Sequence, residues 1–402
     1  MFCLQKIYSP RINGWYNREF AEIKNWQQPN HLVQGEKVWE TLKKQDDNFT
    51  CSNLFFWHNM YSSVDNSVMP KPHYFSNGRK IPDISSHPAH LRDYLVRELG
   101  KFPFMNFWGP EAGIQSSQWI AKAAMVEYEL NRPKLQLVYL PHLDYNLQRF
   151  GSSDPVIQKD VQQIDTVLGE LIDFYEDKGV DIMIVSEYGI SDVDRAVPLN
   201  LILREHGYIG LRHSMGRELL DPGNCRAFAV ADHQFANVYV KDAADISAVK
   251  SLLLQQEGVE QVLDKNEQAQ LGMNHARSGE LVAIAEKGVW FSYYHFYENK
   301  NEPDYARSIS IFDKPSYDPL EMFYDPEIAF VKPKLIWKVF KSKMGFRTSF
   351  DIIPLDTSLV KGSHGRLADQ PGDGPILIAP KRFARDQFHM LDLKQTILDY
   401  YN

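Results

Sequence analysis

The sequence has few cysteines, no long apolar run and no excess of positive charge. Its three cysteines, Cys3, Cys51 and Cys225, are widely separated. This spacing excludes a disulfide framework and a zinc finger and predicts free thiols in a reducing compartment. No run of about 18 apolar residues occurs, so no segment is predicted to span a membrane. The net charge of −8 argues against binding of nucleic-acid polymers, which requires a basic surface.

What the chain does contain is typical of a globular protein. Hydrophobic residues make up 44% of the chain and charged residues 24%, which is ordinary for a globular protein. The length of 402 residues predicts two or three domains, or one large domain with an insertion. The segment 1–6 has no apolar stretch followed by small residues, so nothing indicates secretion and a cytoplasmic location is expected. Aromatic residues make up 13% of the chain and predict a large core; stacking on a base or sugar is the alternative for a few of them.

Two apolar strands flank a long helix near the middle of the chain. Residues 135–140 form a short β-rich run, residues 156–178 have helical spacing of apolar side chains, and residues 180–186 form a second apolar run. Strand, helix and strand in this order are typical of a βαβ unit. We therefore predict an α/β fold with a mostly parallel sheet and helices on both of its faces.

The following residues indicate a smaller unit inserted into this fold. Strand character at 227–240, a helix at 246–254 and strands at 259–263 and 280–286 predict a small α+β insertion. The expected limits are a first part of the core at 1–207, the insertion at 208–277 and a return to the core at 278–402.

Acidic residues follow both central strands. Asp144 and Glu187 are expected at the carboxyl ends of neighbouring parallel strands, where ligands bind in such sheets. Two carboxylates that close repel unless they share a proton or a cation. His364, in a glycine-flanked loop, could add a nitrogen ligand, and zinc accepts such mixed sets. The alternative is that each carboxylate is a helix N-cap or a surface charge.

Several motifs together resemble a known family. They are Val138-Tyr-Leu-Pro-His-Leu-Asp144 through Arg149-Phe-Gly151, Ile184-Val-Ser-Glu-Tyr-Gly-Ile190, Lys361-Gly-Ser-His-Gly365 and the strand at 277–286. In order and spacing, over roughly residues 130–370, they resemble the nucleotide pyrophosphatase/phosphodiesterase group of the alkaline phosphatase superfamily.

The resemblance implies a two-metal phosphohydrolase with an alkaline phosphatase-like fold. One or two divalent ions, expected to be zinc, would activate a Thr or Ser nucleophile. By motif position, Asp144 and His364 match ligands of one metal and Glu187 matches a ligand of the second. The implied substrate is a phosphodiester or pyrophosphate of a nucleotide-like or other small phosphate ester.

Some positions depart from the family pattern. Gln148 stands where the family has a metal-binding His, and Tyr188 stands where it has a second His. Tyr188 is expected to donate a hydrogen bond to phosphate or to a carboxylate. His142 could replace the first missing ligand, because side chains two apart along an extended segment point the same way; the alternative is a packed histidine. Asp232 and His233 could also reach the site, or form a structural hydrogen-bonded pair.

The front of the family pattern is not recognisable. The strand with a metal-binding Asp and the nucleophilic Thr or Ser are expected to be missing, and Ser9, which precedes Pro10, is not expected to be the nucleophile. The catalytic nucleophile is therefore unidentified. This leaves a second hypothesis, an impaired or non-catalytic relative that acts as a binding module.

A basic stretch lies further along the chain. The segment Lys332–Lys343 carries five lysines with apolar residues between them and predicts a helix. A solvated helix face is the first interpretation, and contact with an acidic lipid or a nucleotide is the alternative.

Overall fold

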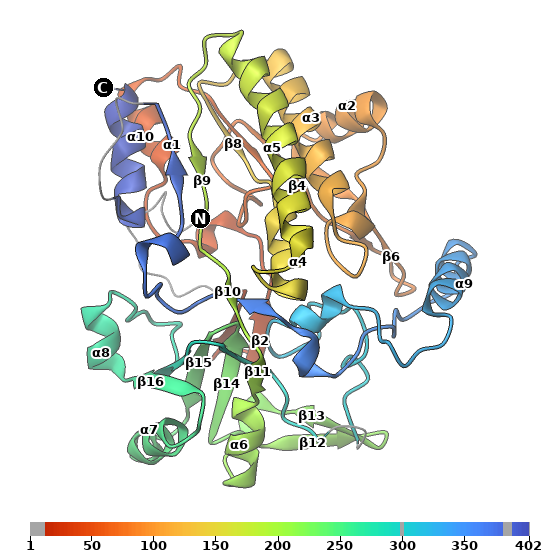
Figure 1. Ribbon diagram of the computed structural model, residues 1–402, viewed down its shortest axis with the longest axis vertical. Coiled ribbons are helices and arrows are strands. Elements are labelled where there is room, and N and C mark those ends of the chain that lie inside the picture. The colour runs from red at the N-terminus through yellow and green to blue at the C-terminus, as the bar shows by residue number, and fades with distance from the viewer. Residues whose placement is uncertain (1–12, 298–300, 381–387, 402) are drawn as a thin grey trace.

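The computed structural model describes residues 13–297, 301–380 and 388–401, so that Cys3 and Ser9 lie outside the described residues. The chain forms two bodies, one above the other in Figure 1. The upper body holds the long helices, and the lower body is built on a four-stranded sheet. No helix in these ranges is both long and apolar enough to cross a bilayer.

The upper body is a four-stranded sheet with helices on both faces. In the order β7-β4-β3-β8, strand β3 pairs in parallel with β4 and β8, and β7 pairs antiparallel with β4. One face packs against α2, α3 and α5, and the other packs against α1 and α10. Coverage of both faces agrees with the prediction. The bounds are α1 Val38–Gln45, β3 Cys51–Leu54, β4 Asn66–Pro70, β7 Ile84–His87, α2 His90–Leu99, α3 Ile114–Asn131, β8 Leu135–Val138, α5 Pro155–Glu176 and α10 Leu393–Tyr401.

The predicted pairing of the two central strands is wrong. Strand β9 (Ile184–Val185) pairs antiparallel with β20 (Leu377–Ile378), and in the described part of the chain no ladder joins it to β8. The sheets are small and mixed, so a mostly parallel sheet is not confirmed. The physical reason is that β9 has only two residues, and its partner lies about 190 residues further along, where the local pattern gives no sign of it.

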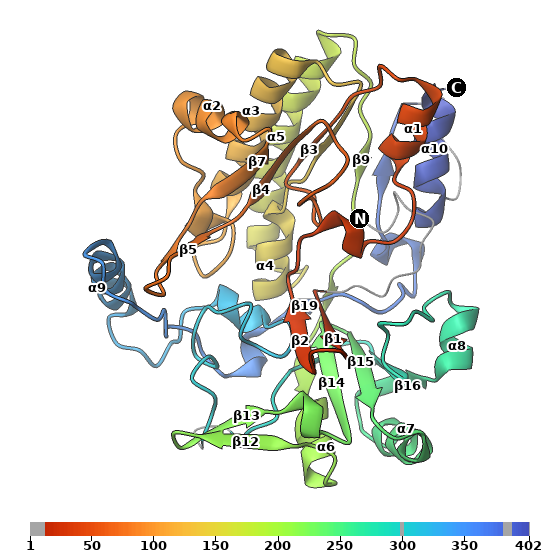
Figure 2. The same cartoon turned by 180° about the vertical axis from the view of Figure 1, so that it is seen from behind.

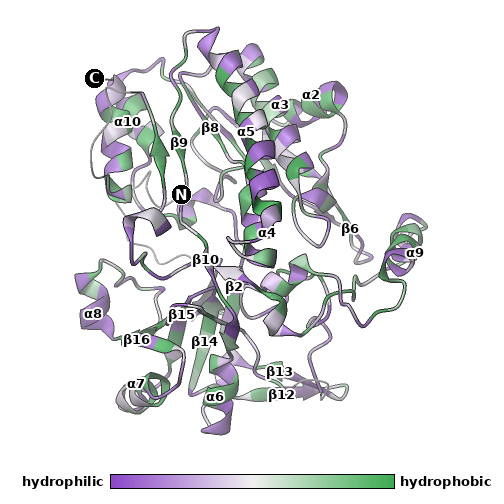
Figure 3. Ribbon diagram, viewed as in Figure 1, coloured by the Kyte–Doolittle hydropathy of each residue, from purple (hydrophilic) through white to green (hydrophobic). Residues whose placement is uncertain are grey.

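The lower body combines helices with an antiparallel sheet. Its antiparallel sheet runs β14-β15-β17-β16, and these strands with helices α6 and α7 enclose a core rich in alanine and valine. Figure 3 shows the hydrophobic character of β14. The domain limits at 207 and 277 stay a prediction; β17, from the segment after 277, belongs to this same sheet. The bounds are α6 Leu199–Glu205, β14 Ala227–Asp232, β15 Phe235–Val240, α7 Ile246–Leu254, β16 Val259–Leu263 and β17 Leu281–Ala285.

A hairpin from the start of the described chain packs on the lower body. Strands β1 (Gly14–Asn17) and β2 (Glu22–Asn25) pair antiparallel, and Tyr16 packs against Phe228 and Tyr239. Figure 2 shows this hairpin beside β14 and β15. It therefore joins chain segments more than 200 residues apart.

The other elements lie at the periphery or border the space between the bodies. Within 292–297 and 301–330, the ranges that the structure describes there, one short 3₁₀ turn, Pro319–Met322, is the only named element. The remaining bounds are β5 His73–Tyr74, β6 Lys80–Ile81, α4 His142–Phe150, β10 Ser191–Asp192, β11 Arg195–Val197, β12 Leu211–Ser214, β13 Arg217–Leu220, α8 Lys265–Gln270, β18 Val289–Phe291, α9 Val331–Lys343 and β19 Gly362–Ser363.

Candidate active site

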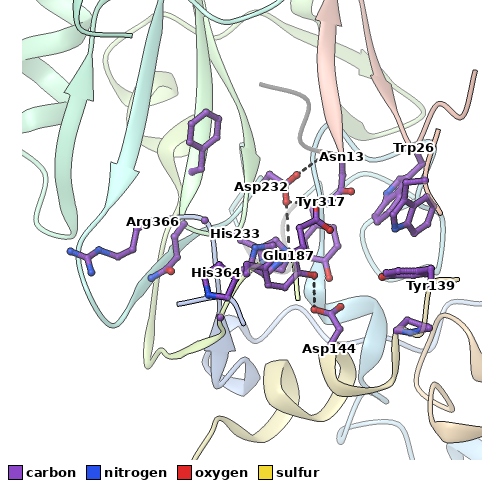
Figure 4. A pocket seen from close by; sticks show the side chains of 18 of the residues that line it. Asn13, Trp26, Tyr139, Asp144, Glu187, Asp232, His233, Tyr317, His364 and Arg366 are labelled. Atoms are coloured by element: carbon purple, nitrogen blue, oxygen red, sulfur yellow. Dashed lines mark hydrogen bonds and ion pairs between the residues drawn. The ribbon is translucent and has the colours of Figure 1, made fainter. Parts of the chain in front are cut away.

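A cavity of about 660 Å³ lies where the two bodies meet. Its walls come from the start of α4, the loop after β9, the turn between β14 and β15, the loop at 311–317 and the loop after β19. Figure 4 shows the side chains that point into it. Residues from these five distant parts of the sequence therefore share one cavity.

Asp144 on α4 is held by two neutral hydrogen-bond donors. The Tyr188 hydroxyl donates to Asp144 Oδ1 at 3.0 Å, and Gln148 Nε2, one helical turn away, donates to Asp144 Oδ2 at 2.8 Å. The Tyr317 hydroxyl in turn donates to Gln148 Oε1 at 3.0 Å. The expectation that Tyr188 hydrogen-bonds a carboxylate is confirmed.

The surroundings of Asp144 favour its neutral form. Burial raises the pKa of its carboxyl to about 6, against the opposing hydrogen bonds from Gln148 and Tyr188, and the nearby charge of Glu187 raises it further. Asp144 therefore exchanges its proton near neutral pH, which is where a general acid or base is most effective.

His364 lies in a stack of rings. Its ring centroid is 3.6 Å from that of Tyr188, with the two planes 10° apart, and 3.8 Å from that of His233. The stack is fixed from the backbone as well, because Gln234 N donates to His364 O at 2.8 Å. Burial lowers the pKa of His364 to about 3, so the ring is neutral at physiological pH.

Asp232 and His233 reach the cavity from the turn between β14 and β15. His233 has a positive φ of 60°, a backbone conformation that L-residues seldom adopt and that turns its ring onto His364 and Tyr317. Asp232 accepts hydrogen bonds from Asn13 N at 2.6 Å and Asn13 Nδ2 at 3.2 Å. Burial nevertheless raises the pKa of Asp232 to about 7. A second carboxyl that titrates near neutral pH thus borders the same cavity.

Glu187 contributes a further carboxylate to this group. It is exposed and lines the cavity just after β9. Strands β8 and β9 are not neighbours, yet the segments that follow them meet at one cavity, so Asp144 and Glu187 come together as the sequence predicts.

The expectation that His142 shares an ion with Asp144 is wrong. The segment is helical, not extended, and residues two apart on a helix point about 200° away from each other. His142 is buried between α4 and α5, with its Nε2 3.6 Å from Asp160 Oδ1. The alternative, a packed histidine, is confirmed.

The donor set for a metal is incomplete. Among residues 13–297, 301–380 and 388–401, no three His, Cys, Asp or Glu side chains converge to hold an ion. Both oxygens of Asp144 are engaged by Tyr188 and Gln148, and the His364 ring is stacked between two others. As arranged, Asp144, Glu187 and His364 do not fit a zinc ion.

An aromatic wall faces these polar groups, and sequence reasoning missed it. Trp26 lies at its centre, with ring centroids 4.9 Å from Trp57, 5.9 Å from Trp108 and 6.0 Å from Tyr317. Tyr139 extends the wall 6.1 Å beyond Trp57. The richness in aromatic residues was the only sign of it, because the members are up to 291 positions apart. Such a wall suits a flat apolar group.

A buried ionic cluster supports this wall. Lys314, only 2% exposed, lies 2.6 Å from Asp318 and 2.9 Å from Glu321. Glu321 also accepts a hydrogen bond of 2.7 Å from the Trp108 indole. The cluster thereby fixes both Trp108 and the loop that carries Tyr317.

Comparisons with known proteins agree on one family. Residues 12–308 match the family described as type I phosphodiesterase/nucleotide pyrophosphatase. An uncharacterized pyrophosphatase/phosphodiesterase of Schizosaccharomyces pombe is 37% identical over 65 residues, which are 15% of this chain and only 13% of that protein.

Solved structures show a more distant likeness. Phosphonoacetate hydrolase from Sinorhizobium meliloti, in complex with phosphonoacetate, has a TM-score of 0.47 and 13% identity over 79% of this chain and 72% of that chain. Murine ectonucleotide pyrophosphatase/phosphodiesterase 5, in complex with AMP, has a TM-score of 0.46 and 12% identity over 75% of this chain and 71% of that chain.

Proposed function

This chain belongs to the type I phosphodiesterase/nucleotide pyrophosphatase family, and on that basis we propose that it hydrolyses a phosphodiester or pyrophosphate bond. The proposed substrate is a nucleotide-like or other small phosphate ester that carries a flat group. The observation that carries this proposal is the placement of Asp144, Tyr188 and His364 opposite the aromatic wall within one cavity. A volume of about 660 Å³ is in the range that suits a small ligand.

The residues divide the work according to their chemistry. The aromatic wall would hold the flat group. The Tyr188 and Tyr317 hydroxyls would keep Asp144 and Gln148 in place beside the phosphoryl group through the hydrogen bonds they donate to them. Asp144 and Asp232, with pKa values of about 6 and about 7, would move protons to or from the reacting oxygens.

Release of p-nitrophenol from bis(p-nitrophenyl) phosphate, with product analysis by phosphorus NMR, tests this activity. We expect release above the buffer rate, a monoester product and inhibition by AMP. Absence of turnover across added Zn²⁺, Mn²⁺ and Mg²⁺ would contradict the hydrolase proposal.

One observation favours a second function, binding without turnover. Tyr188 and Gln148 each donate a hydrogen bond to Asp144, so neutral donors rather than a cation stabilise this carboxyl in the cavity. Calorimetric binding of AMP without hydrolysis of any ester would support this second function over the first. Failure of both binding and turnover would reject the two together.

Metal dependence is general in this family. The side chains now present do not fit zinc, so we propose that zinc binding requires the two histidines that this chain lacks. We expect the double variant Gln148→His and Tyr188→His to gain zinc, since both histidines would face Asp144 and His364 and complete a ligand set. Bound zinc is expected to rise to about one ion per chain, as measured by atomic emission and by the visible spectrum of the cobalt form.

The matched control for the zinc variant is Gln162→His with Tyr61→His, because both of those side chains are exposed and lie outside the cavity. This control should gain no zinc. If the wild type already binds one zinc ion and Asp144→Ala abolishes that binding, Asp144, Glu187 and His364 do fit zinc. The ligands predicted from the sequence would then be right.

Trp26→Ala tests the role of the aromatic wall. Loss of one stacking partner is expected to weaken binding of AMP about tenfold, within the range measured for base stacking on aromatic side chains. Binding of inorganic phosphate should be unchanged. Calorimetry measures both, and Trp337→Ala, on the distant helix α9, is the control; equal weakening for both ligands would indicate a folding defect instead.

A further inference from the structure

Helix α9 exposes an unusual number of large apolar side chains. None of its residues is buried. Six apolar side chains on the helix and its flanks are each between 50 and 82% exposed: Phe330, Ile336, Trp337, Phe340, Met344 and Phe346. Figures 1 and 2 both show α9 at the edge of the molecule, and Figure 3 shows apolar and polar residues mixed along it. Apolar surface gathered in this way marks an interaction site.

The apolar side chains on the helix share one face, and lysines flank them. Ile336, Phe340 and Met344 follow each other at intervals of four, which places them in one row along the helix. Trp337 stacks on Phe340 with ring centroids 5.6 Å apart, and Lys341 Nζ lies 5.9 Å from the Trp337 ring.

The charge of this segment has a single sign. Residues 328–350 include five lysines and Arg347 and no acidic residue, in a chain whose net charge is −8. Lys334 and Lys338 form ion pairs with Asp351. The segment carries four further cations, Lys332, Lys341, Lys343 and Arg347. Lys332 lies four residues before Ile336 and therefore continues the apolar row at its start.

The neighbouring hairpin β5–β6 has the same character. The Arg347 side chain lies against Gly78 in the turn of this hairpin. Tyr74, Phe75 and Ile81 are each more than 40% exposed there, beside the cation Arg79. The apolar and basic surface therefore continues from α9 onto a second element.

We propose that α9 and the β5–β6 hairpin bind the surface of an anionic lipid bilayer. A helix with an apolar face bordered by lysines lies in the interface plane, with its apolar side chains among the acyl chains and its lysine heads at the phosphates. Tryptophan and tyrosine favour this depth. In the cytoplasm, the location expected from the sequence, this surface would have access to the negatively charged inner leaflet of the membrane.

The apolar row distinguishes a bilayer from other partners. A nucleic acid would use the cations and leave six large apolar side chains in water. A bilayer takes up both kinds of group at once, and its negative charge complements Lys332, Lys341, Lys343 and Arg347. The inference is independent of the proposed function, since it uses no residue of the cavity.

Vesicle sedimentation tests the proposal with the full chain. Binding to phosphatidylcholine vesicles that contain about 30 mol% phosphatidylglycerol is expected to be at least roughly tenfold stronger than binding to pure phosphatidylcholine, and to weaken as salt is added. Brominated lipids should quench tryptophan fluorescence, and Trp337→Phe should remove most of that quenching while binding persists.

Two variants separate the apolar and the charged contributions. Trp337→Ser with Phe340→Ser keeps the charge and should reduce vesicle binding about tenfold. Lys341→Gln with Lys343→Gln should reduce the preference for anionic lipid and its salt dependence. All four sites are on the surface, so folding should not change. The matched controls are Leu130→Ser with Val161→Ser and Lys122→Gln with Lys159→Gln, which alter exposed residues on α3 and α5.

Three results would overturn the proposal. The first is equal binding to anionic and neutral vesicles. The second is vesicle binding unaffected by Trp337→Ser with Phe340→Ser, which indicates charge attraction alone, as expected for a surface that binds nucleic acid. The third is a concentration-dependent dimer, seen by sedimentation velocity, that the same variant dissociates, because a second copy of this chain would then cover the apolar row.

Discussion

Asp144→Asn is expected to lower kcat/KM for phosphodiester hydrolysis about 100-fold or more while making the folded protein more stable. The loss of activity follows because the amide cannot donate or accept the transferred proton. The gain in stability follows because Asn carries no charge to bury. Its oxygen can accept from Gln148 Nε2 while its NH2 donates to the Tyr188 oxygen, so both hydrogen-bond partners are kept. Steady-state kinetics and urea unfolding measure the two effects separately.

The stability gain should depend on pH in a defined direction. In the unfolded chain the pKa of Asp144 is 3.8, and in the folded protein burial raises it to about 6. Stability associated with the protonated carboxyl is therefore complete below pH 4 and is lost as the pH rises through 6. The difference between Asp144→Asn and wild type should grow from near zero at pH 4 to about 3 kcal/mol above pH 7.

The control for this prediction is Asp165→Asn, an exposed carboxylate on α5. Its unfolding free energy should stay within about 0.5 kcal/mol of wild type at every pH. The prediction is wrong if both variants show the same pH dependence of unfolding free energy, or if Asp144→Asn is less stable than wild type above pH 7. Either result would mean that burial does not raise the pKa of Asp144.

Lys314→Met is expected to cost about 3–5 kcal/mol of unfolding free energy. Burial alone would lower the pKa of Lys314, but the charges and hydrogen bonds of Asp318 and Glu321 outweigh it and raise that pKa, so the lysine is charged in the core. Methionine fills a similar volume but leaves two carboxylates buried without a cation. Urea unfolding measures the loss, and weaker AMP binding should accompany it, because Glu321 holds Trp108 in the aromatic wall.

Removing the whole ionic cluster should be far less harmful than removing its cation. Lys314→Met combined with Asp318→Asn and Glu321→Gln leaves no unpaired charge and is expected to recover most of the lost stability. Lys332→Met, an exposed lysine on α9, is the control for the loss of one positive charge. If the triple variant is as unstable as the single one, the loss arises from packing of the lysine stem and not from unpaired charge.

Local patterns predicted local structure well. The helix α7 and the strand β16 have the bounds that the sequence predicts, Ile246–Leu254 and Val259–Leu263, because the spacing of apolar residues within each element determines which face it buries. The motifs around Asp144, Tyr188 and His364 also led to one cavity, although a metal-binding role for them stays a prediction.

The incorrect predictions concern the local backbone conformation around Asp144 and the contacts between distant segments. An extended segment would put His142 beside Asp144, but α4 begins at His142 and turns its side chain to the opposite side. Strand β9 pairs with β20 and not with β8, and its two residues are too few for the sequence to indicate that partner. The aromatic wall has no local signature, since Trp26 and Tyr317 meet only through the tertiary fold.

The hairpin β1–β2 also has a consequence for how the protein is made. Trp15 is buried, Tyr16 packs against Phe228 and Tyr239, and Asn13 binds Asp232, all in strands that the ribosome completes more than 200 residues later. At a translation rate of about 5–20 residues per second, Trp15 and Tyr16 stay exposed for roughly 10–45 seconds before the strands that bury them are synthesised. The lower body therefore closes only after translation of most of the chain, and a chaperone that shields the hairpin during this interval should increase the yield of folded protein.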